Sequence, residues 1–172
     1  AFVSKSTDSS GGETRFYVVF FRVCGVTETS AADDVAVRHE VLMDECARVR
    51  KSDEMEVSSE HSSVYGRILC LRNPVPALNA AKQVLDGAAR RNVPLAIGIA
   101  VGRLTEVEDL GRRNRIGPAI NLAARLAANK QMAGTDSKEE GTIQKADGKI
   151  YVDDGVFKDV GNSKFPEMSF EG

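Results

Sequence analysis

The residues best placed to do chemistry are an asparagine and an arginine four positions apart, Asn121 and Arg125. They belong to the stretch 115–126, which reads RIGPAINLAARL; Gly117 allows a backbone turn there, and Pro118 suits the first position of a helix. Residues four apart on a helix lie on the same side, so both polar side chains point the same way, opposite the apolar ones. Periodicity alone has a simpler interpretation, an amphipathic helix whose solvated face carries both residues.

The order of residues in this stretch narrows the interpretation. The pattern GxxINxAxR, from Gly117 to Arg125, has five fixed positions in nine residues and resembles the signature of class III nucleotidyl cyclase catalytic domains. The resemblance implies that Asn121 orients the ribose of a nucleotide and that Arg125 stabilises negative charge developing on its phosphates. Both are therefore candidate catalytic residues.

Length and composition fit one globular domain. The chain has 172 residues, 42% of them hydrophobic, and a formal net charge of −2. These values supply enough apolar side chains for one core and give no basic footprint for nucleic acid. Residues 1–14 are polar and lack apolar periodicity, so we expect a flexible lead-in followed by the cyclase homology domain in residues 15–172.

The cysteines and the lengths of the apolar runs indicate which cellular compartment to expect. Cys24, Cys46 and Cys70 lie among apolar neighbours, have no metal-binding spacing and cannot all pair with one another. A reducing compartment is the simpler inference. No apolar run approaches the ~20 residues of a membrane span, and no signal peptide precedes the first strand. We therefore expect a cytoplasmic segment that makes no membrane contact.

Apolar periodicity predicts a mixed sheet-and-helix fold. The run 16–24 is apolar at nearly every position, which is typical of a central strand covered on both faces. A helix is predicted over 31–51, capped by Thr29 or Ser30. The later elements are two strands within 56–71, a helix over 75–91 and a strand over 95–101. This order predicts an α+β fold, a ferredoxin-like split βαβ antiparallel sheet with helices on one face.

The cyclase resemblance extends to the first strand and the hairpin, with two departures. The family's first strand ends in FxDxxGFT, and residues 20–27 read FFRVCGVT, so Arg22 stands where the resemblance places a metal-binding aspartate. The family's hairpin carries a Gly-Asp pair with the second metal ligand, and the matching pair here is Gly66 and Arg67. Hard cations need oxygen ligands, and a guanidinium stays protonated at physiological pH. We therefore expect no metal site and no cofactor.

Other positions match the family unevenly. The segments 98–102 (GIAVG) and 150–153 (IYVD) resemble two later strands of the family. The positions that select the purine base in the family, three residues before the glycine of each motif, are Ser63 and Asn114 here. Neither predicts a preference for adenine or guanine. The family's triphosphate-binding lysine has no match, because Lys164 is followed by Phe-Pro.

These features together predict a catalytically inactive cyclase-like domain that forms a dimer and acts as a regulatory or ligand-sensing module. The candidate residues for binding a nucleotide or another phosphate-bearing ligand are Arg22, Arg67, Ser63, Asn114 and Gly117. Two alternatives stay open: half of a heterodimeric adenylyl/guanylyl cyclase completed by a partner chain, and a pure protein-interaction scaffold. A homodimer, or a heterodimer with another cyclase-like domain, is expected because the first strand is apolar on both faces while helices cover only one.

Arg22 and Arg67 carry a further expectation. They should approach each other at adjacent strand ends, where two like charges repel unless an anion lies between them. Either a carboxylate of the chain or a phosphate-bearing ligand is expected in that space.

Overall fold

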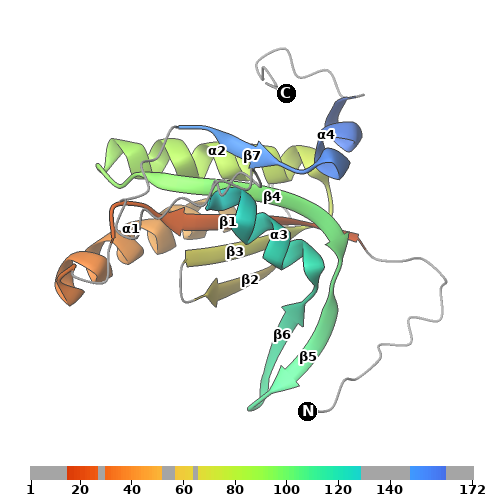
Figure 1. The fold of residues 1–172 in the computed structure, drawn as a ribbon. Coiled ribbons are helices and arrows are strands. Elements are labelled where there is room, and N and C mark those ends of the chain that lie inside the picture. The colour runs from red at the N-terminus through yellow and green to blue at the C-terminus, as the bar shows by residue number, and fades with distance from the viewer. Residues whose placement is uncertain (1–14, 27–29, 52–56, 64–65, 129–147, 162–172) are drawn as a thin grey trace, which may run out of the picture.

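The computed structural model describes residues 15–26, 30–51, 57–63, 66–128 and 148–161 (Figure 1). In chain order the elements are β1 (Arg15–Val23), α1 (Ala32–Arg50), β2 (Val57–Ser63), β3 (Gly66–Leu71), α2 (Pro74–Arg90), β4 (Leu95–Arg103), β5 (Thr105–Asp109), β6 (Arg112–Ile116), α3 (Pro118–Ala127), β7 (Ile150–Val152) and α4 (Asp154–Gly161). The expected lead-in, residues 1–14, and Lys164 lie outside the described residues.

The main sheet has five strands in the order β2-β3-β1-β4-β7. Neighbouring strands are antiparallel except β4 and β7, which run parallel. The central strand β1 pairs with β4 along its whole length, from Arg15 opposite Arg103 to Val23 opposite Leu95. Together with the helices, this confirms the predicted α+β fold and the predicted order of the elements from β1 to β4.

Alternate side chains of β1 enter two different cores, which explains why the strand is apolar throughout. Tyr17, Val19, Phe21 and Val23 pack in the core under α1 and α2. Phe16, Val18 and Phe20 pack in the core under α3. The two long helices thus share one face of the sheet, as expected, and α3 lies across part of the other face (Figure 1).

The position of α3 corrects one step of the sequence reasoning. We expected the second face of β1 to need a partner chain, because only one face was assigned helices. In the structure Phe16 and Phe20 are 5% and 4% exposed, and Val18 is fully buried. The chain itself covers this face, so an uncovered β1 is no argument for a dimer.

The start of α1 differs from expectation. The N-cap residue is Ala31, which makes no side-chain capping hydrogen bond, so the prediction of Ser30 as the cap was wrong. Thr29, the other candidate, lies outside the described residues. Asp33 and Asp34 stand in the first turn, where they complement the helix dipole.

A hairpin that the sequence analysis did not predict, formed by β5 and β6, projects from the main sheet (Figure 1). Its two-residue turn is Leu110-Gly111, with φ values of 48° and 74°. The strands read TEVED and RRNRI, so neither shows the apolar alternation by which a half-buried strand is recognised. Register instead pairs acidic residues of β5 with arginines of β6.

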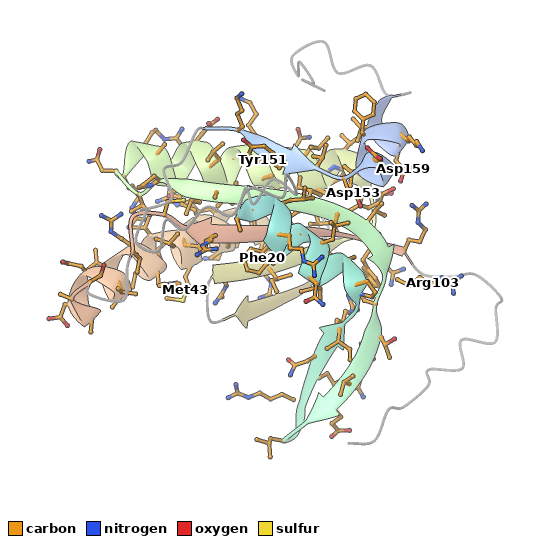
Figure 2. All side chains as sticks on the ribbon, viewed as in Figure 1. Phe20, Met43, Arg103, Tyr151, Asp153 and Asp159 are labelled. Atoms are coloured by element: carbon orange, nitrogen blue, oxygen red, sulfur yellow. The ribbon has the colours of Figure 1, made fainter. Side chains whose placement is uncertain are left out.

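The C-terminal elements are fastened to the sheet by two aspartates, Asp153 and Asp159 (Figure 2). Asp153 accepts hydrogen bonds from the backbone N–H of Val156, at 2.8 Å, and of Val101, at 3.3 Å. It thereby caps α4 and ties it to β4. Tyr17 donates its hydroxyl proton to Asp159 at 2.6 Å. Burial and this hydrogen bond raise the pKa of Tyr17 to about 12.

None of the helices in the described ranges has the length and apolar character needed to cross a membrane.

Candidate functional site

An open groove of about 590 Å³ lies where the start of α3 meets β6 and β3. Its lining residues are Ile68, Asn114, Arg115, Ile116, Gly117, Pro118, Ile120 and Asn121. One wall is therefore apolar, and the polar groups are two amides and one guanidinium. Since none of these eight residues carries a carboxylate, the lining offers hydrogen-bond donors and positive charge to an electron-rich ligand.

The place of α3, and so of the groove, is fixed by small residues on both sides of its contact with β4. Ala119, Ala123 and Ala127 form the buried stripe of the helix. A Cβ added to Gly98 of β4 would lie 2.2 Å from the carbonyl oxygen of Ala123 and 2.6 Å from the amide nitrogen of Ala127. Only glycine at position 98 lets the helix backbone approach this strand so closely.

Gly117 begins α3 as predicted, but for a different reason. The residue is the N-cap and Pro118 stands in the first turn. Its φ of 166° is extended backbone that any residue adopts, so the expectation of an unusual turn was wrong. A Cβ here would lie 2.6 Å from the carbonyl oxygen of Arg103 and 2.9 Å from the Leu104 side chain. Glycine is needed because the chain that precedes β5 passes against it.

Arg115 fills the junction between the hairpin and the main sheet. Its guanidinium carbon lies 4.2 Å from the centre of the Phe16 ring, within the range of a cation–π contact. Its Nη2 atom is 3.8 Å from Oε1 of Glu106, and its side chain is only 16% exposed. The residue therefore holds β6 against β1 and places its neighbour Asn114 at the groove.

Three of the residues predicted from sequence meet at this groove: Asn114, Gly117 and Asn121. Arg125 lies one helical turn beyond Asn121 and is exposed, but it does not line the groove. Asn121 and Arg125 were predicted to lie on the same side of the helix. Their exposure agrees with this, since both lie on the side of α3 away from its buried alanines.

Arg22 and Arg67 occupy neighbouring strand positions without facing each other. Register pairs Arg22 with Gly66 and Phe21 with Arg67. Paired residues share a face, and successive residues alternate, so Arg67 belongs to the face of Phe21, under α1 and α2. Arg22 belongs to the opposite face, with Phe20 and α3. The expectation that the two guanidiniums share one anion was therefore wrong.

The glycine of the hairpin motif still meets β1 closely. A Cβ added to Gly66 would lie 1.7 Å from the carbonyl oxygen of Phe21, so no other residue fits without moving the strand. Ser63 pairs with Gly66 in the β2–β3 ladder, and its side chain lies outside the described part. Within the described residues, no group of three or more His, Cys, Asp or Glu side chains lies together in a way that could hold a metal ion.

The sequence analysis missed two contributors to the groove. Ile68 reaches it from β3, and Arg115 reaches it through its contact with Phe16. Both depend on contacts between residues far apart in the chain, which local spacing does not reveal. The only local signal is position, because Arg115 directly follows Asn114 within the cyclase-like motif.

Comparison with known proteins bears on the fold. No family model matches the chain, and no match is found among curated proteins. Among solved structures, the catalytic core of a rhodopsin-guanylyl cyclase in complex with ATPalphaS is similar with a TM-score of 0.62 and 14% identity, over 87% of this chain and 82% of that one. The non-canonical dimeric guanylyl cyclase domain of the RhoGC fusion protein from the aquatic fungus Blastocladiella emersonii also gives a TM-score of 0.62 and 14% identity, over 86% of this chain and 84% of that one.

An adenylate/guanylate cyclase/hydrolase from Silicibacter pomeroyi gives a TM-score of 0.56 and 18% identity, over 87% of this chain and 81% of that one. At these identities the comparisons establish the fold alone. The chain has the fold of class III adenylyl and guanylyl cyclase catalytic domains.

Proposed function

We propose that this domain is a catalytically inactive cyclase homology domain that dimerises and serves as a cytoplasmic regulatory or ligand-sensing module. One observation carries the proposal: arginines, Arg22 and Arg67, stand at the two positions where the cyclase pattern has its metal-binding aspartates. The strand register supports this alignment, because Arg22 pairs directly with the glycine that precedes Arg67.

The substitution removes what the cyclase reaction requires. Two divalent cations activate the attacking hydroxyl and neutralise the polyphosphate, and each needs oxygen ligands. An arginine in place of an aspartate removes the ligand and changes the local charge from −1 to +1. Titration of free Mn²⁺, followed by electron paramagnetic resonance, tests this step. The proposal predicts no site of micromolar affinity, and one saturable Mn²⁺ site per chain would overturn it.

The groove is the proposed ligand site. Asn114 and Asn121 present amide groups beside an apolar wall, which suits a base or sugar, and Arg22 lies on the same face of the sheet. A phosphate-bearing ligand held without metal would meet guanidinium groups in place of cations. Arg67 belongs to the other face, so we assign it no part in this groove.

Calorimetry with ATP and GTP in EDTA tests ligand sensing. Metal-free binding that weakens in Asn121→Ala and Arg22→Gln, and not in the exposed α2 variant Lys82→Gln, supports the site. If neither nucleotide binds, these two ligands are excluded and the pure interaction scaffold is favoured.

A heterodimeric cyclase half is the rival with the most specific support, since Asn121 and Arg125 keep the family pattern. In that case a partner chain supplies both aspartates. Co-purification with a chain that carries an intact FxDxxGFT strand, with cyclase activity only in the mixture, would favour the rival. Dimerisation itself is tested by light scattering over a wide concentration range.

A further inference from the structure

A buried carboxylate lies on the face of the sheet away from the candidate groove. Glu45 of α1 is 4% exposed, and it is the buried charged residue among those that the structure describes. Nη1 of Arg91 donates a hydrogen bond to Asp44 at 3.1 Å, but it lies 3.6 Å from Oε1 of Glu45, which is beyond hydrogen-bond distance. Glu45 therefore accepts no hydrogen bond from the described part of the chain, which is unusual for a buried charge.

The chain makes room for this carboxylate at the expense of α2. A Cβ added to Gly87, inside that helix, would lie 2.1 Å from Oε2 of Glu45 and 2.6 Å from its carboxyl carbon. Glycine inside a helix costs about 1 kcal/mol relative to alanine. Two helices joined through alanine and an apolar residue would be more stable than two joined through glycine and a buried charge. The retained carboxylate therefore indicates a use other than joining α1 to α2.

Glu45 lines a cavity of about 300 Å³ between α1 and α2, which is at the lower end of the volumes of small-molecule sites. These two helices lie together on the face of the sheet opposite α3 (Figure 1). The lining residues are Glu45, Arg48 and Val49 of α1 and Gln83, Asp86 and Arg90 of α2. In contrast to the groove beside α3, this cavity presents charges of both signs.

Ion pairing within the chain leaves three of these charges unmatched. Asp86 has a partner, because its Oδ2 atom lies 3.5 Å from Nζ of Lys82. Arg48 and Arg90 form no ion pair or hydrogen bond with the described residues. One carboxylate, that of Glu45, and two guanidiniums therefore remain to be matched. Their complement is a molecule that carries one ammonium group and two acidic groups.

We propose that this cavity binds a small dicarboxylic amino acid, a class whose simplest members are L-glutamate and L-aspartate. The ammonium group donates hydrogen bonds to Glu45, and the two carboxylates accept hydrogen bonds from Arg48 and Arg90. This site shares no lining residue with the groove and lies on the other face of the sheet. It is thus a second ligand site, and it does not depend on the proposed function of the groove.

Calorimetry with matched ligands tests the charge pattern. L-glutamate should bind saturably to the wild-type chain. Glutarate, which lacks the amino group, and 4-aminobutyrate, which lacks one carboxylate, should each bind about tenfold more weakly or worse. If glutarate and inorganic phosphate bind as tightly as L-glutamate, the cavity is a general anion-binding surface and the proposal is wrong.

Glu45→Gln separates recognition from a structural role. The variant lacks the charge that matches the ammonium group, so L-glutamate should lose its advantage over glutarate. If Glu45 only joined the helices, the ratio of the two dissociation constants would stay as in wild type. A ratio that does not change would therefore overturn the proposal.

Two arginine variants test the other end of the ligand. Arg48 and Arg90 are exposed, so Arg48→Gln and Arg90→Gln should keep the wild-type unfolding temperature while binding L-glutamate about tenfold more weakly. The matched control is Arg112→Gln, which removes an exposed arginine of the β5–β6 hairpin and should bind L-glutamate as wild type does. Equal affinity in all three variants would contradict the assignment.

Nuclear magnetic resonance locates the bound ligand. The amide resonance of Gly87 should shift on addition of L-glutamate, and shifts confined to other elements would refute the site. No saturable binding of L-glutamate or L-aspartate to wild type would refute the proposal as a whole. Neither result affects the nucleotide titrations or the light scattering, which test the proposed function.

Discussion

The contact between α3 and β4 gives the sharpest test of how the groove is built. In Gly98→Ala the new methyl group would lie 2.2 Å from the carbonyl oxygen of Ala123, 2.6 Å from the amide nitrogen of Ala127 and 2.8 Å from the Leu126 side chain. Two of these three atoms belong to the helix backbone and cannot rotate away. The gap to Ala123 must widen by about 0.8 Å to reach even 3.0 Å, so the helix has to move.

Overpacking a closely packed core costs about 1–3 kcal/mol, and a rigid obstacle belongs at the upper end. We therefore expect Gly98→Ala to lower the free energy of unfolding by about 3 kcal/mol, measured by urea denaturation. The same shift of α3 should move the amide resonances of Asn114 and Asn121 at the groove.

Gly102→Ala is the matched control on the same strand. Its methyl group would lie 3.0 Å from the Cβ of Ala119, with no backbone atom closer than 4.0 Å. The cost of this tight contact is offset because alanine lowers the conformational entropy of the unfolded chain. The free energy of unfolding should therefore change by less than about 1 kcal/mol. If the two variants unfold at the same urea concentration, the close approach of α3 to β4 is refuted.

Three further outcomes follow from contacts elsewhere. Burial, and then the hydrogen bond to Asp159, raise the pKa of Tyr17 from 10.0 to about 12, so its contribution to stability is complete below pH 10 and is lost as the pH rises through 12. Over this range the free energy of unfolding of wild type should fall by up to about 2 kcal/mol relative to that of Tyr17→Phe. Parallel pH profiles of the two proteins would contradict this. Asp153→Ala removes the cap of α4 and should cost about 1–2 kcal/mol in urea denaturation, whereas an unchanged midpoint would show that the cap contributes nothing. Nη1 of Arg91 lies 3.6 Å from Oε1 of Glu45, which is the buried charged residue among those described. Arg91→Gln leaves that carboxylate without its partner and should lower the free energy of unfolding by about 1–3 kcal/mol, whereas Glu45→Gln should lower it by less. The reverse order of unfolding temperatures would contradict this.

Sequence reasoning succeeded where the signal was local or strongly apolar. β1 was predictable because both of its faces enter a core, which leaves a continuous run from Phe16 to Cys24. The start of α3 was predictable because Pro118 fixes it locally. The motif likewise located Asn121, which lines the groove.

The failures share a physical cause, because they depend on pairing between distant segments. The hairpin of β5 and β6 places acidic residues opposite arginines, and its strands read TEVED and RRNRI, which gives no apolar signal in the sequence. Arg22 and Arg67 lie on opposite faces of the sheet because of the register between β1 and β3. The sequence places both residues near strand ends but does not give this register. The contact between Arg115 and Phe16 joins residues 99 positions apart.

Nucleotide turnover by the purified chain tests the central claim most directly. The account predicts no cyclic AMP or cyclic GMP from ATP or GTP, with either Mg²⁺ or Mn²⁺, because electrostatic preorganisation elsewhere in the site does not replace two metal ions. Arg125→Ala provides the control, since product that persists in this variant comes from a contaminating enzyme. Cyclic nucleotide that forms with wild type and disappears with Arg125→Ala would contradict the account.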